Sequence, residues 1–158
     1  MKKLLTVLLA LTMILSFASC GGSSSENKES FDAKAASEKL LASDEFKGCA
    51  LVDADQTELE YDITLEDTQE FYFAKVSSGT SANMFIIAVA KEGQSSLMCG
   101  EMEKIEKTYA SSWVDSTYQE RLAEAPKVNA RYVSEKNGMY ICIISSDNDA
   151  CLELIGLK

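Results

Sequence analysis

The 158-residue sequence predicts an α+β fold: two hairpins form a largely antiparallel sheet, packed by one long amphipathic helix and shorter helices. Two runs rich in aromatic and β-branched residues, at 70–78 and 83–91, are separated by a short turn and indicate one hairpin. Apolar residues then recur at helical spacing from Met98 to Trp113. Asn137-Gly138 indicates the second hairpin, because a type I′ turn needs positive φ at both central positions.

The first half of the domain begins with a predicted helix. Segment 31–46 has alanines and a leucine at helical spacing. Ser30 is its expected cap, Asp32 suits its first turn, and Gly48 would end it. In 49–63 a short apolar run is followed by alternating apolar and charged residues, which favours one or two short edge strands.

The second half contains the longest predicted helix, which starts at Ser95. Its apolar stripe is Met98, Met102, Ile105, Tyr109 and Trp113. Ser116 to Gln119 has the pattern of a capping box, opening a shorter helix that ends before Pro126. Asp147 is expected to cap a C-terminal helix. The runs MFIIAVA and MYICIIS are apolar on both faces, which predicts central strands.

The N-terminus has the three parts of a secretory signal: the basic pair Lys2-Lys3, the apolar run Leu4–Phe17, and small residues before Cys20. The apolar run is short of the roughly 20 residues that span a bilayer. The alternative is an ordinary cleaved signal followed by a chance cysteine.

Ala18-Ser19-Cys20 resembles the lipobox of bacterial lipoprotein signals, although Phe17 stands where leucine is commoner. The resemblance implies that the signal peptide 1–19 is removed and that the sulfur of Cys20 carries a diacylglyceryl group. Two acyl chains anchor a protein stably, whereas one binds only marginally. We therefore expect a lipid-anchored protein on the outer face of the cell membrane.

The Gly/Ser-rich segment 20–30 then reads as a flexible linker, and 31–158 as a single globular domain. The formal net charge is −10, and would be −12 once Lys2 and Lys3 are lost with the signal. Such an acidic chain argues against nucleic acid as a partner and against electrostatic docking on anionic lipid. Attachment to the membrane is expected through the N-terminal lipid alone.

The sequence contains no histidine. This excludes Ser-His-Asp and Cys-His catalysis and histidine-ligated zinc. We expect no cofactor. Four cysteines follow the anchor, namely Cys49, Cys99, Cys142 and Cys151. An even number outside the cell allows disulfides in three connectivities, or each can be a small buried apolar residue.

The sharpest chemical pattern is the acidic segment with Asp53, Asp55 and Thr57. A short apolar run before Asp-x-Asp-x-Thr resembles the first motif of haloacid-dehalogenase-like phosphatases, which implies a nucleophile at Asp53, a general acid at Asp55 and bound magnesium. The remaining members of such a set would be Ser77, Lys127, Asp147 and Asp149. That family uses parallel strands with helical crossovers, whereas this sequence predicts tight antiparallel hairpins, so a chance match in an acidic loop is favoured.

Two other kinds of site are suggested by the sequence. An EF-hand calcium loop starting at Asp53 fails, because Glu58 and Thr64 stand where glycine and glutamate are needed; a looser calcium or magnesium site stays open. Trp113, Tyr109 and Tyr118 are candidates for a ligand groove, but the first two lie on the apolar stripe of the long helix, so core packing is favoured.

From Asp32 to its end the chain resembles a family of small lipoproteins from Gram-positive anaerobes that carry a domain of unknown function. The resemblance lies in the lipobox, the segment YDITLEDTQEFYF, the long helix and NGMYICIISSD. Met84 stands where that family often has an acidic residue. The resemblance implies location and domain boundary, not activity. We expect a non-enzymatic module that binds a protein, peptide or cell-wall ligand, with a magnesium-dependent phosphatase as the alternative.

Overall fold

The computed structural model describes residues 31–158, of which Asp32–Lys158 form one compact unit. The signal peptide, Cys20, the linker and the expected cap Ser30 lie outside the described residues. Within the described part, five strands form one antiparallel sheet in the order β1-β2-β3-β5-β4. The predicted α+β fold is therefore confirmed. No helix among these residues is both long and apolar enough to cross a membrane.

The elements follow one another from helix α2 to helix α7. In chain order they are α2 (Ala33–Ala42), the 3₁₀ turn η1 (Asp44–Phe46), β1 (Cys49–Leu51), α3 (Ala54–Tyr61), β2 (Thr68–Val76), β3 (Met84–Ala90), α4 (Ser95–Val114), α5 (Gln119–Leu122), α6 (Ala125–Asn129), β4 (Tyr132–Lys136), β5 (Met139–Ile144) and α7 (Asn148–Leu154).

Both predicted hairpins are present. Strands β2 and β3 pair in antiparallel register, and the turn between them contains Gly79 at φ +65°. Strands β4 and β5 meet at Asn137 and Gly138, whose φ angles of +55° and +75° fit the predicted type I′ turn. The two doubly apolar strands, β3 and β5, occupy central positions, as predicted.

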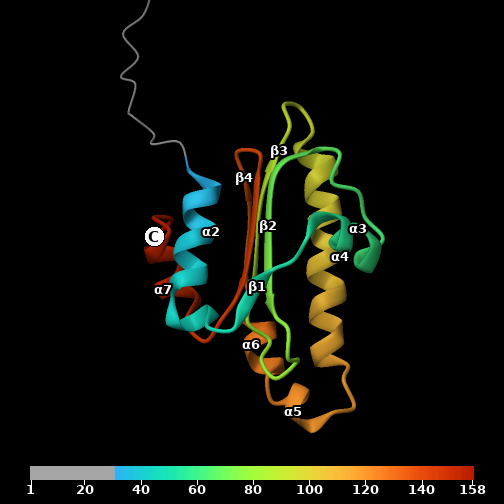
Figure 1. Cartoon of the computed structure of the whole chain (residues 1–158), viewed down its shortest axis with the longest axis vertical. Coiled ribbons are helices and arrows are strands. Elements are labelled where there is room, and N and C mark those ends of the chain that lie inside the picture. The colour runs from blue at the N-terminus through green and yellow to red at the C-terminus, as the bar shows by residue number, and fades with distance from the viewer. Residues whose placement is uncertain (1–30) are drawn as a thin grey trace, which may run out of the picture. The chain divides into compact units, whose positions relative to one another are not determined.

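The sheet is covered on both faces (Figure 1): α2 and α7 lie against one face and α4 against the other. The alternation of side chains along β3 fills both layers. Phe85 is fully buried on the α2 side, where its ring meets Phe46 edge to face at 5.2 Å. Its neighbour Ile86 is fully buried in the core under α4. This double coverage explains why β3 carries no polar side chain.

The long helix α4 buries the whole predicted stripe. Met98, Met102 and Ile105 are fully buried, and Tyr109 and Trp113 retain 7% and 4% of their exposure. The predicted stripe is therefore confirmed, and it faces the sheet rather than solvent.

Three predicted helix boundaries are corrected. Helix α2 ends at Ala42, well before Gly48, and Asp32 is its N-cap: the carboxylate accepts a hydrogen bond from the Ala35 amide at 2.8 Å. The predicted capping box at Ser116 is wrong, because α5 begins only at Gln119 and the Ser116 hydroxyl accepts from the Tyr118 amide instead. That helix does end before Pro126, which lies in the first turn of α6, where proline is tolerated.

Candidate functional site

The acidic segment predicted as a loop is the start of a helix. Asp53 is the N-cap of α3, and its carboxylate accepts hydrogen bonds from the amides of Asp55 (3.0 Å) and Gln56 (3.4 Å). Asp55 lies in the first turn, where a negative charge suits the helix dipole. Both side chains are exposed. The expectation of a second edge strand over 59–63 is wrong, because α3 runs to Tyr61.

Of the other four members of the phosphatase set, Ser77 lines a pocket described below, and the other three are engaged elsewhere. Lys127 donates to Asn83 and Glu124, at 2.8 and 2.6 Å, and Asp147 caps α7, as predicted, by accepting from the Ala150 amide. Asp149 pairs with Lys158 at the C-terminus. Within residues 31–158, no three His, Cys, Asp or Glu side chains are grouped so that they would hold a metal ion.

The capping role of Asp53 gives a test. Asp53→Ala should lower the free energy of unfolding by about 1 kcal/mol, because the amides at the start of α3 lose their acceptor. Asp53→Asn should leave stability nearly unchanged, since asparagine caps as well as aspartate. Urea unfolding of the three proteins measures this difference.

The same variants address the phosphatase alternative. With magnesium, wild type and Asp53→Asn should release product from an aryl phosphate at the same background rate. Hydrolysis by wild type that Asp53→Asn abolishes would contradict the capping role as the sole function of this carboxylate.

The four cysteines of the domain are free thiols. Cys142, on the central strand β5, is fully buried. Cys99 and Cys151 are also buried, with 8% and 2% of their surface exposed. Cys49 is half-buried, and burial raises its pKa to about 11. Burial raises the pKa of the other three thiols as well, so all four are poor nucleophiles at neutral pH.

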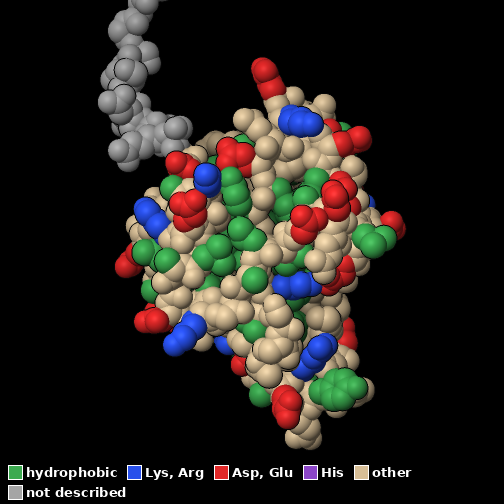
Figure 2. All heavy atoms as spheres, viewed as in Figure 1, with side chains coloured by type: hydrophobic (Ala, Val, Ile, Leu, Met, Phe, Trp, Pro, Cys, Tyr) green, Lys and Arg blue, Asp and Glu red, His purple; other side chains and the backbone are tan. Residues whose placement is uncertain are grey.

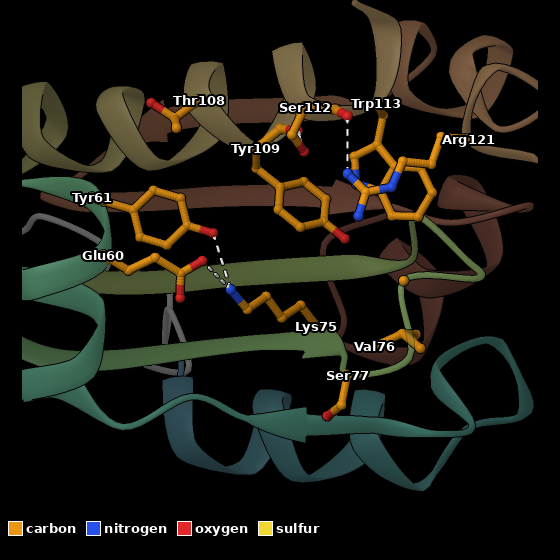
Figure 3. Close-up of a pocket in the computed structure, with 11 residues that line it drawn as sticks. Glu60, Tyr61, Lys75, Val76, Ser77, Thr108, Tyr109, Ser112, Trp113 and Arg121 are labelled. Carbon is orange, nitrogen blue, oxygen red and sulfur yellow. Dashed lines mark hydrogen bonds and ion pairs between the residues drawn. The ribbon is translucent and has the colours of Figure 1, made fainter. Parts of the chain in front are cut away.

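A pocket of about 330 Å³ lies where α3, the end of β2, α4 and α5 meet (Figure 3). We call it the Trp113 pocket. Its lining residues are Glu60, Tyr61, Lys75, Val76, Ser77, Gly79, Thr108, Tyr109, Ser112, Trp113 and Arg121. Its volume falls in the range of small-molecule sites, and its wall combines aromatic rings with a few charged and hydroxyl groups.

Lys75 is the basic residue at the centre of this pocket. It projects from β2 on the α4 side, because it follows Phe71 and Phe73 at alternate positions. Its ammonium group pairs with Glu60 at 2.5 Å and donates to the Tyr61 hydroxyl at 3.3 Å (Figure 3). It also lies 5.3 Å from the centroid of the Tyr61 ring, a cation–π distance.

Arg121 is the second cation of the pocket. Its guanidinium carbon lies 5.3 Å from the centroid of the Trp113 ring, and Figure 3 shows the group over that ring. One nitrogen donates to the Ser112 carbonyl at 3.4 Å, which is a long hydrogen bond. A cation stacked on tryptophan is held in place by the ring quadrupole and by apolar contact.

Two buried tyrosines complete the wall. Burial raises the pKa of Tyr61, and the carboxylate of Glu60 raises it further; burial likewise raises the pKa of Tyr109. Both phenols therefore stay protonated at neutral pH and keep their ability to donate a hydrogen bond. The third predicted aromatic, Tyr118, is 70% exposed and does not line the pocket. Core packing, the favoured interpretation, applies to Tyr109 and Trp113, yet both also border the cavity.

The loop beside the pocket is fixed by hydrogen bonds to α6 and its N-cap. Glu124 accepts from the Ala82 amide at 3.0 Å and pairs with Lys127 at 2.6 Å. Burial alone would raise the pKa of Glu124, but the bonds from Lys127 and Ala82 outweigh it and hold the pKa below its usual value. These contacts position the β2–β3 turn, which carries Ser77 and Gly79 to the pocket.

A second hollow, of about 440 Å³, lies between the start of α4 and the β4–β5 turn. It is lined by Cys99, Glu103 and Glu135 among others, and no aromatic ring borders it. Glu103 is already paired with Lys107. The second hollow is larger but has no aromatic residue in its wall, whereas the Trp113 pocket combines aromatic rings with polar groups and is therefore the better candidate site.

Sequence reasoning missed Lys75, Glu60 and Arg121. For Lys75 a signal existed, because this lysine continues the alternating, core-facing series of Phe71 and Phe73 along the strand. Arg121 carries no such signal, since its place above Trp113 depends on the path of residues 115–118.

No protein-family model, curated protein or solved structure matches this chain. The resemblance to small lipoproteins of Gram-positive anaerobes therefore stays a prediction, and function rests on the geometry described above.

Proposed function

We propose that this protein is a lipid-anchored binding module on the outer face of the cell membrane, and that the Trp113 pocket holds its ligand without chemical change. The signal and lipobox that end at Cys20 support the location. The pocket supports the binding role. Its ligand is a small molecule or the end of a chain, such as a peptide or a cell-wall fragment.

The observation that best supports the binding role is that side chains distant in the sequence converge on one cavity. Side chains from separate elements, α3, β2, α4 and α5, turn toward one cavity and bring rings, cations and hydroxyls together (Figure 3). Ordinary core packing does not need two cations against three aromatic rings, because burial of charge is costly. A preformed site with a few polar groups has this composition.

The same geometry favours binding over catalysis. Lys75, the central cation, is engaged by Glu60 and Tyr61. The Ser112 hydroxyl donates to the Tyr109 carbonyl at 2.6 Å rather than to a general base. An activated nucleophile needs an adjacent base within hydrogen-bond reach.

Trp113 is the single tryptophan of the chain, so its fluorescence reports on this pocket. The detergent-solubilised lipoprotein should show a saturable emission change with a soluble digest of purified cell wall or with a pool of short peptides. Lys75→Met should weaken that binding about tenfold or more, as expected for a lost hydrogen bond to a charged group.

Lys104→Met is the matched control, because Lys104 lies on the exposed side of α4 with a 54% exposed side chain. It should bind like wild type. No emission change with either probe, or equal effects of the two lysine variants, would overturn the proposal.

A further inference from the structure

We infer that the ligand of the Trp113 pocket carries an oxyanion, a carboxylate or a phosphate, which Arg121 holds at the edge of the Trp113 ring while the ligand's adjoining flat or apolar part contacts the tyrosines. This inference rests on the proposed function and names the class of ligand.

The first argument is the local charge. The chain as a whole has 25 acidic and 15 basic side chains, yet the pocket lining has two cations and one carboxylate. Glu60 is paired with Lys75. Arg121 has no carboxylate partner within salt-bridge distance among residues 31–158. Figure 2 shows more acidic side chains on the upper part of the face than on the lower part, and basic side chains scattered over its whole length.

The second argument is the orientation of Arg121. The guanidinium carbon lies over the Trp113 ring, a cation–π arrangement that leaves N–H groups at the edge of the guanidinium for a ligand. A guanidinium has five donors, and the described contacts use one of them for a long bond to Ser112. Carboxylate and phosphate match this planar fork with two parallel hydrogen bonds. The contact with Trp113 holds this group in place before the ligand arrives, which lowers the entropic cost of ordering it on binding.

The third argument concerns what lies beside the oxyanion. Tyr61 and Tyr109 are 9% and 7% exposed, so each presents ring surface and a protonated hydroxyl to the cavity rather than a charge. Tyr109 and Trp113 lie close together, with ring centroids 6.1 Å apart. Rings of this kind favour a flat or apolar group on the ligand. The adjacent turn comes close as well, since a Cβ added at Gly79 would lie 3.5 Å from Arg121.

Matched probes separate charge from shape. Benzoate, phenyl phosphate and the neutral benzamide are titrated into the ¹⁵N-labelled lipoprotein in detergent, and the single indole N–H resonance of Trp113 is followed. We expect benzoate, phenyl phosphate or both to shift it saturably, and benzamide to bind at least tenfold more weakly. Raising the salt concentration should weaken anion binding. A response to benzoate alone would indicate a carboxylate ligand, and one to phenyl phosphate alone a phosphate ligand.

Variants of Arg121 identify the group responsible. Arg121→Gln should abolish the preference for anions, and Arg121→Lys, which keeps the charge but loses the fork, should weaken anion binding about tenfold. Lys107→Gln removes a charge from the exposed side of α4 and should change nothing. Unfolding curves of each variant establish that it is folded. Equal binding of benzamide and the anions, no response to any probe, or unchanged anion binding in Arg121→Gln would overturn the inference.

The same Arg121→Gln variant distinguishes the two proposals. If cell-wall digest or peptides bind this variant as they bind wild type, the proposed binding function is supported and the inference of an oxyanion on the ligand is contradicted. If wild type responds to none of these materials, both the binding function and the oxyanion inference are contradicted.

Discussion

Cys20→Ala should move this protein out of the membrane fraction, or leave it as a longer, unprocessed precursor. The reason is that the sulfur of Cys20 is the predicted site of the diacylglyceryl group, and a cysteine there is needed for lipobox processing. Each buried CH₂ of an acyl chain contributes about 0.8 kcal/mol of membrane affinity, so losing two chains removes nearly all of it. Fractionation, together with the mass of the N-terminal peptide, measures the effect.

Cys49→Ala is the matched control, because it removes a half-buried thiol from β1 within the domain. It should stay in the membrane fraction with a wild-type N-terminus. A Cys20→Ala protein that fractionates and migrates like wild type would refute the lipid anchor. It would leave the pocket-based argument untouched, since the pocket depends on residues 60–121 alone.

The parts of the fold that were predicted correctly are those encoded by local patterns. The stripe from Met98 to Trp113 has the helical period, and one buried face follows from it. Asn137-Gly138 specifies its turn through two backbone conformations that few other residues adopt. Apolar character on both faces of β3 and β5 places them centrally, because an edge or half-exposed strand would not tolerate it.

The misassigned segment is α3, where two local signals competed. Leu59, Tyr61 and Ile63 alternate like a strand, but Leu59 is 87% exposed, so this alternation does not correspond to burial. The pair that faces inward is Thr57 and Tyr61, four residues apart on one side of the helix. Asp53 at the cap, with Asp55 in the first turn, outweighed the alternation.

The candidate site was not predictable from the sequence because its members meet only through tertiary structure. Glu60 and Lys75 are 15 residues apart in the sequence. Arg121 belongs to the short helix α5, which follows α4, whereas Glu60 and Lys75 precede α4. The aromatic residues were singled out, but their helical spacing explained them as core. What changes their interpretation is the presence of Arg121 over the Trp113 ring and of Lys75 over the neighbouring Tyr61 ring in the same cavity.

Phe73→Ala should lower the free energy of unfolding by about 3–5 kcal/mol, the usual cost of truncating a buried phenylalanine. Phe73 is fully buried on β2, and its ring meets Tyr61 at 5.7 Å and Tyr109 at 6.5 Å, both edge to face. Against a total stability of about 5–15 kcal/mol, this loss is large. Urea unfolding followed by circular dichroism measures it, and Phe73→Leu provides a milder variant that retains apolar volume.

Phe73 does not line the Trp113 pocket itself but supports residues that do, since its ring packs against Tyr61 and Tyr109 and its centroid lies 5.6 Å from the Lys75 ammonium group. Phe85→Ala separates that role from stability, because Phe85 is equally buried but packs against Phe46 on the opposite face of the sheet. Both alanine variants should lose similar stability, yet only changes at Phe73 should shift the Trp113 indole resonance and weaken probe binding. If Phe85→Ala perturbed the pocket as much as Phe73→Leu, the two faces would be coupled through the sheet, and the pocket could not be a preformed site supported by Phe73.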